Sequence, residues 1–285
     1  MYKRIVVGFD DSNPSRAALA ESSDWTKEHG GKIILVHAVY FDPEEFGTAP
    51  DQLERRFELG RKVCIREKDK LAADLGVEVE SLICEGEPPE VITDIAREKG
   101  ADLIAMGTYG RKGLNRLLMG SVTSGVILKA PCDVLVVRNA SNGSSGKYRS
   151  ILLPYDGSDF SKKALEHACE LSKAEGASLT ALYAIPRYEE MIGFFRTDSV
   201  KKSLFQEAQK IISGARELAS QRGVSIRVEI EEGRAGDKIV KTAQELKSDL
   251  IVMGSYGWRG VDKAIMGSTT ERVIMTSPCP VLVVR

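Results

Sequence analysis

The chain has 285 residues, a length that fits two domains of ordinary size. Its 40 Lys and Arg residues balance 41 Asp and Glu residues, and the net charge of −1 argues against a general nucleic-acid binder, which needs a basic excess. The apolar runs are too short for a signal-peptide core or a membrane span. We therefore expect a soluble, cytoplasmic protein whose partners include neither nucleic acid nor a membrane.

Strand and helix patterns alternate along the first half of the chain. Continuous runs rich in Val and Ile predict buried strands, and amphipathic segments that stop at glycine predict helices. In chain order we expect strand 4–9, helix 13–29, strand 33–39, helix 51–75, strand 77–84, helix 89–99, strand 103–106, helix 121–129 and strand 134–137. This alternation predicts a parallel sheet with helices on both faces, where ligands bind beyond the carboxyl ends of the strands.

The second half of the chain repeats the first. DLIAMGTYGRKGLNRLLMG at 102–120 matches DLIVMGSYGWRGVDKAIMG at 249–267, with ten of nineteen positions identical. The segment RIVVGFDDS near the start likewise matches SILLPYDGS at 150–158. A repeat this long indicates a duplicated domain, since solenoid repeats are shorter. The stretch between the copies is small, polar and glycine-rich, so we predict domains 1–140 and 147–285 joined by a linker at 141–146.

The same potential binding residues recur in both halves. Each half has an Asp after its first strand, and a glycine-rich loop after its fourth strand leads into a helix. Glycines let the backbone approach an anion, and a helix N-terminus attracts phosphate, whereas a carboxylate suits the donors of a base or a ribose. The repeated positions are Asp10, Gly107, Gly110, Gly120 and Ser121 in the first half, and Asp156, Gly254, Gly257, Gly267 and Ser268 in the second.

A simpler interpretation of these residues needs no ligand. The glycines could serve only as turn residues, Ser121 and Ser268 only as helix caps, and Asp10 as a capping acid. One glycine pattern alone is weak evidence, but two copies with the same spacing favour a binding site.

The motif G-x2-G-x9-G-[ST], together with the strand-Asp-x-Ser start, resembles the ATP-binding branch of the universal stress proteins, twice and over essentially the whole chain. The resemblance implies two tandem, doubly wound α/β domains, each Rossmann-like with a five-stranded parallel sheet in the order 3-2-1-4-5. It implies ATP, ADP or AMP as the ligand, with Mg²⁺ as an optional companion of the triphosphate. It places adenine at Asp10 and Asp156, and it adds contacts at Ala38, Val122, Ala184 and Thr269.

One family position differs between the two halves. The basic residue that usually follows the second glycine is Arg111 in the first half, whereas the second half has Trp258. Arg111 could reach the outer phosphates, so we predict that the first site prefers ATP over AMP more strongly than the second. Alternatively, both side chains point into solvent and do not discriminate.

The resemblance predicts a stress-response protein that regulates by binding adenine nucleotides, one per domain, with little or no turnover. The alternative is a slow ATP hydrolase or a nucleotidyl-transfer enzyme. The chain lacks both G-x-x-x-x-G-K-[ST] and S-G-G-x-D-S, and we predict no catalytic and no metal-binding residue. The apolar end strands at 133–138 and 280–285 lie at a sheet edge in the family's order. They predict an intrachain pseudo-dimer of the two domains and leave a further homodimer open.

Overall fold

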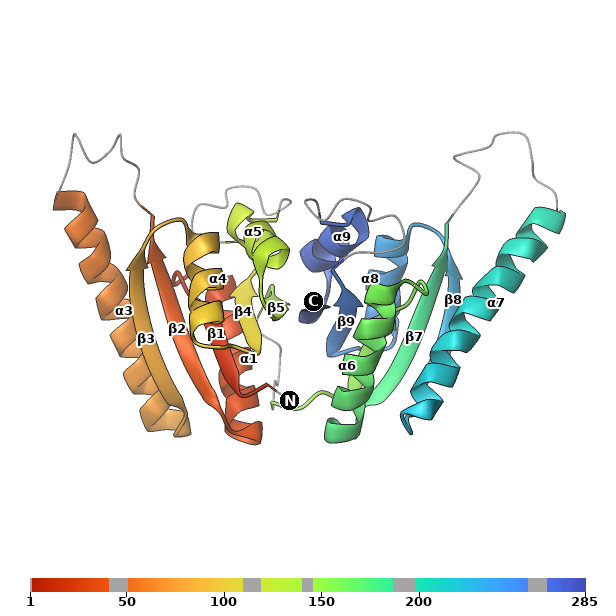
Figure 1. The fold of residues 1–285 in the computed structure, drawn as a ribbon, viewed down its shortest axis with the longest axis horizontal. Coiled ribbons are helices and arrows are strands. Elements are labelled where there is room, and N and C mark those ends of the chain that lie inside the picture. Colours follow the sequence, from red (N-terminus) through yellow and green to blue (C-terminus); the bar gives the residue numbers. More distant parts are fainter. Residues whose placement is uncertain (1, 41–50, 110–118, 140–145, 187–197, 256–265) are drawn as a thin grey trace. The chain divides into compact units, whose positions relative to one another are not determined.

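The computed structural model describes residues 2–40, 51–109, 119–139, 146–186, 198–255 and 266–285 (Figure 1). The chain divides into two compact units, Met1–Lys147 and Tyr148–Arg285. Except for Gly146, the predicted linker lies outside the described residues. None of the helices in these described ranges is long and apolar enough to cross a membrane.

The first unit is an α/β domain with the predicted strand order. All its strand pairs are parallel, in the order β3-β2-β1-β4-β5, which confirms the doubly wound arrangement. Every boundary lies within one residue of the prediction, because glycines follow α1, α3 and α4 and short apolar runs form the strands. The elements are β1 (Arg4–Gly8), α1 (Asn13–His29), β2 (Lys32–Val39), α3 (Asp51–Leu75), β3 (Glu78–Glu85), α4 (Pro88–Glu98), β4 (Leu103–Gly107), α5 (Ser121–Lys129) and β5 (Asp133–Val137).

The second unit repeats this architecture, as the duplicated sequence predicted. Its parallel sheet has the order β8-β7-β6-β9-β10, which is the same 3-2-1-4-5 pattern within the unit. The elements are β6 (Ser150–Pro154), α6 (Asp159–Glu175), β7 (Ser178–Ile185), α7 (Asp198–Gln221), β8 (Arg227–Glu232), α8 (Ala235–Glu245), β9 (Leu250–Gly254), α9 (Ser268–Thr276) and β10 (Val281–Val284).

The core of each unit surrounds the central strands. All five residues of β4 and all five of β9 are buried, as expected for parallel strands covered on both faces. Helices α1 and α3 contact each other, and so do α4 and α5. Because β1 lies between β2 and β4, the loops that follow β1 and β4 leave the sheet side by side.

The first unit ends on the surface of α1. The Nε2 atom of His29 donates a hydrogen bond to the Gly146 carbonyl (3.2 Å), and Lys147 Nζ pairs with Glu28 Oε1 (2.6 Å). Gly146 has a φ of +71°, and a side chain there would overlap the carbonyl of Asp24. The chain therefore leaves the first unit in a conformation that suits glycine.

Candidate functional site

Two loops meet at the carboxyl edge of the first sheet. Strand β1 pairs with β4 through Ile5↔Leu103 and Val7↔Ala105, so the loop carrying Asp10 emerges next to the loop that begins at Gly107. A Cβ on Gly107 would lie 2.6 Å from Pro14 Cβ and 2.8 Å from the Ser15 nitrogen. This glycine therefore allows the first turn of α1 to pack on the end of β4.

The second sheet has the same contact. A Cβ on Gly254 would lie 2.7 Å from Phe160 Cβ and 2.9 Å from its carbonyl carbon, in the first turn of α6. In both units the first glycine of the motif thus has a packing role between the two loops. The simpler interpretation had assigned these glycines to turns only.

Asp10 and its counterpart Asp156 fold the loop rather than cap the helix. The side chain of Ser12 caps α1 by accepting from the Ser15 nitrogen, and Ser158 caps α6 in the same way. Asp10 Oδ1 accepts from the Ser12 nitrogen at 3.1 Å, and Asp156 Oδ1 accepts from the Ser158 nitrogen at 3.0 Å. Both carboxylates are half-buried at the sheet edge.

The helices α5 and α9 begin without a side-chain cap. Their N-caps are Gly120 and Gly267, which have no side chain that could cap the helix. Ser121 and Ser268 are the exposed first residues of these helices, so they do not occupy the capping position. An uncapped helix start presents backbone N–H donors and the positive end of the helix dipole, which together suit a phosphate.

One backbone and one side-chain hydrogen bond fix the start of α5 to the end of β4. The Gly120 nitrogen donates to the Thr108 carbonyl at 3.0 Å, and Thr123 Oγ1 donates to the Gly107 carbonyl at 2.8 Å. Because Gly107 also touches α1, the uncapped helix and the Asp10 loop are attached to the same strand end.

The other predicted residues fall into two groups. Ala38 and Ala184 lie near the carboxyl ends of β2 and β7, and Val122 and Thr269 are the second residues of α5 and α9; all four are half-buried. Gly110, Arg111 and Gly257 lie outside the described residues.

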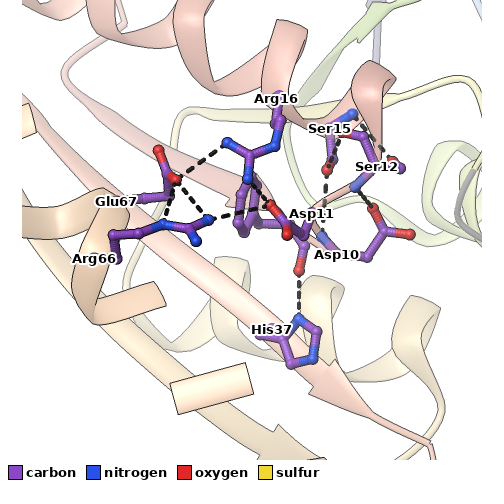
Figure 2. Close-up of polar contacts among 9 residues, drawn as sticks. Asp10, Asp11, Ser12, Ser15, Arg16, His37, Arg66 and Glu67 are labelled. Carbon is purple, nitrogen blue, oxygen red and sulfur yellow. Dashed lines mark hydrogen bonds and ion pairs between the residues drawn. The ribbon is translucent and has the colours of Figure 1, made fainter. Parts of the chain in front are cut away.

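Sequence reasoning missed a cluster of charged side chains beside the first loop (Figure 2). Asp11 pairs with Arg16 of α1, and Arg16 Nη1 and Arg66 Nη2 each lie 3.1 Å from Glu67 Oε1 of α3. One signal was available in the sequence, since the first loop has Asp11 where the second has Gly157.

His37 supports the strand end under this loop. Its Nδ1 atom lies 2.7 Å from the Phe9 carbonyl oxygen, and because a carbonyl only accepts, Nδ1 carries the proton (Figure 2). A Cβ on Gly60 of α3 would lie 2.5 Å from the His37 ring, so this glycine allows α3 to pack closely over β2.

Comparisons with known proteins place both halves in the same family. The model of the universal stress protein family matches residues 1–138 and again residues 147–285. A universal stress protein of Methanocaldococcus jannaschii is 35% identical over 153 residues, which cover 53% of this chain and 87% of the relative. A universal stress protein of Mycobacterium tuberculosis is 27% identical over 293 residues, and the match covers 99% of this chain and 96% of that relative.

A crystal structure of a universal stress protein from Archaeoglobus fulgidus has a similar fold. Its TM-score is 0.75 at 24% identity, and the match covers 99% of this chain and 98% of that one.

Proposed function

Because the chain belongs to the universal stress protein family, we propose that each of its two domains binds one adenine nucleotide. The observation that carries this proposal is the meeting of a carboxylate loop and an uncapped helix start at the carboxyl edge of each sheet. Donors suited to phosphate and an acceptor suited to a base or ribose thus follow two neighbouring strands of each sheet.

Charge decides how the nucleotide lies in the first domain. The carboxylate of Asp10 repels phosphate, so the ribose and base lie toward Asp10 and the nearby Ala38. The phosphates lie at the start of α5, where the backbone nitrogens and the Ser121 hydroxyl donate to them. Gly120 leaves room for this approach, and Val122 contributes its backbone N–H.

In the second domain the same roles fall to the corresponding residues of the repeat. They are Asp156 and Ala184 on the base and ribose side, and Gly267, Ser268 and Thr269 on the phosphate side. Gly110, Arg111 and Gly257 complete the proposed phosphate loops from the sequence alone. Gly107 and Gly254 hold the two loops together through their contacts with α1 and α6.

The bound nucleotide acts as a regulatory signal in a stress response, and we place this activity in the cytoplasm. The ligand is ATP, ADP or AMP, and Mg²⁺ is an optional companion of the triphosphate. Turnover stays below about 1 s⁻¹, the low end of ordinary enzyme rates, because the motifs contain no P-loop lysine and no repeated base. Intrachain pairing of the domains stays a prediction, which the oligomeric state of separately expressed domains would test.

Calorimetry with ATP and Mg²⁺ tests the proposal. We expect about two sites per chain, since the binding residues occur once in each domain. Denaturing the purified protein and identifying the released nucleotide by mass shows which nucleotide it carries. Absence of binding at millimolar ATP contradicts the proposal. If the protein hydrolyses ATP faster than the rate given above, and Gly120 variants lose this activity, the enzyme alternative is supported.

A further inference from the structure

We propose that the ionic cluster of Asp11, Arg16, Arg66 and Glu67 positions the nucleotide-binding loop of the first domain and raises that site's affinity for adenosine and its phosphates. The inference rests on the proposed function, because it concerns the same site. These four are positioning residues, which act on the ligand through Asp10. In the second domain an apolar side chain of α7, Ile211, faces the same turn instead.

The backbone at Asp11 is the first observation. Asp11 has a φ of +68°, and Gly157, at the same place in the second domain, has a φ of +80°. The turn from the first strand into the first helix thus uses a left-handed residue in both domains. Glycine adopts this conformation freely, whereas a residue with a side chain is disfavoured there. Aspartate tolerates this conformation better than most residues with a side chain, and contacts that hold its carboxylate stabilise it further.

The side chain of Asp11 supplies those contacts. It pairs with Arg16, and Arg66 Nη2 approaches its Oδ1 to 3.7 Å. Both arginines also bind Glu67 Oε1, with Arg66 using Nε at 3.2 Å and Nη2 at 3.1 Å. The Glu67 side chain is 8% exposed, and a carboxylate buried to that extent requires paired donors. The cluster therefore ties the loop to both α1 and α3.

One peptide bond connects the ionic cluster to Asp10, the residue proposed to contact the ligand. Asp10 adjoins Asp11, and the two side chains are held on different sides of the loop (Figure 2). Asp10 binds the Ser12 nitrogen, whereas Asp11 points toward Arg16 and Arg66. A loop fixed on both sides holds the Asp10 carboxylate in place before the ligand arrives, and such preorganisation improves affinity.

The second domain has the same turn without the charges. A Cβ on Gly157 would lie 3.3 Å from Ile211 of α7, so apolar surface faces the loop there. Lys162, which corresponds to Arg16, pairs with the exposed Asp159 of its own helix at 3.1 Å. The buried side chains among the described part of α7 are apolar: Ala208, Ile212, Ala215 and Ala219.

The test uses the full chain carrying Gly267→Glu, which keeps only the first site. Arg66→Ala is added, and the affinities for adenosine, AMP and ATP are measured by competition with a fluorescent ATP analogue. We expect all three to weaken by the same factor, about three- to tenfold, because the contact being disturbed is on the base and ribose side. In an Asp11→Gly protein, Arg66→Ala should have no further effect. The matched control, Lys162→Ala in the Gly120→Glu chain, should leave the second site unchanged.

Each other outcome overturns the inference. If the parent chain binds and Arg66→Ala binds equally well, the cluster does not position the loop. If ATP weakens while adenosine does not, Arg66 contacts the phosphates directly. If the parent itself binds neither ATP nor adenosine, the proposed function fails first. Thermal unfolding checks that the variant is folded, and Arg66→Gln, which has a shorter but still polar side chain, replaces it if Arg66→Ala unfolds.

Discussion

The starts of α5 and α9 share a backbone but not their surroundings. Both helices begin after an uncapped glycine with extended dihedral angles. A Cβ at Gly120 would lie 3.7 Å from Thr123 Oγ1, and a Cβ at Gly267 would lie 3.7 Å from the corresponding Thr270 Oγ1. The first turn of α5 has no acidic residue, and that of α9 has Glu271. After duplication, the backbone that favours phosphate was kept while the nearby charge changed.

The largest effect is expected from closing one site at a time. Gly120→Glu should remove the first site and Gly267→Glu the second, because the new side chain fills the phosphate position and repels the anion. Calorimetry with ATP should then give about one site in each variant and none in the double variant, by the count of intact motifs. Loss of both sites in either single variant would show that the sites are not independent.

The next effect concerns the outer phosphates. Arg111→Trp, made in the Gly267→Glu chain, should lower the ratio of ATP affinity to AMP affinity by about ten- to a hundredfold, the range for a charged hydrogen bond. Trp258→Arg in the Gly120→Glu chain should raise the same ratio at the second site. If the ratio of ATP affinity to AMP affinity is the same in the Gly120→Glu chain and the Gly267→Glu chain without further changes, Arg111 does not reach the phosphates.

A smaller effect on ATP affinity should come from the acidic residue in the first turn of α9. Glu271→Ser should strengthen ATP binding at the second site about two- to fivefold, since a carboxylate in the first turn competes with phosphate for the helix dipole. Ser124→Glu, the reciprocal change in α5, should weaken the first site by a similar factor. The neutral ligand adenosine is the control, and its affinity should not change in either variant.

The smallest effect on nucleotide binding should come from replacing Tyr2, whose hydrogen-bond partner has no counterpart in the second domain. Its hydroxyl donates to Asp133 Oδ2 at 2.6 Å, and burial, followed by the charge of Asp133, raises the pKa of Tyr2 well above its usual value. The second domain has Pro280 in place of Asp133. The pKa of Tyr2 is higher in the folded protein than in the unfolded chain. The contribution of its hydrogen bond to folding stability is therefore present below about pH 10 and is lost as the pH rises further.

Tyr2→Phe should therefore lower the unfolding temperature of the protein near neutral pH and flatten its decline above about pH 10. Binding of ATP should not change. Thermal unfolding followed from pH 7 to 11 measures both, and an equally steep alkaline decline in the variant would assign that decline to other groups.

The sequence sufficed for elements whose signals are local. Glycine stops and short Val- and Ile-rich runs located most elements of the first domain, the sequence repeat extended them to the second, and the family resemblance supplied the strand order. The cluster around Asp11 was missed because it depends on side chains that lie far apart in the chain; Arg16 and Glu67 are 51 residues apart. The packing role of Gly107 was missed for a similar reason, since only the folded backbone shows how close Pro14 approaches.

The central position of β1 has a consequence for the order of events during synthesis. Its neighbour β4 is made much later, and the hydrogen bond from the Arg4 nitrogen to Asp102 closes a separation of 98 residues. At about 5–20 residues per second, the first strand waits several seconds on the ribosome for its partner. The first domain can then close before β9, the close copy of β4, has been made. Vectorial synthesis thus protects two similar sheets from exchanging strands, a protection that refolding of the whole chain from denaturant does not offer.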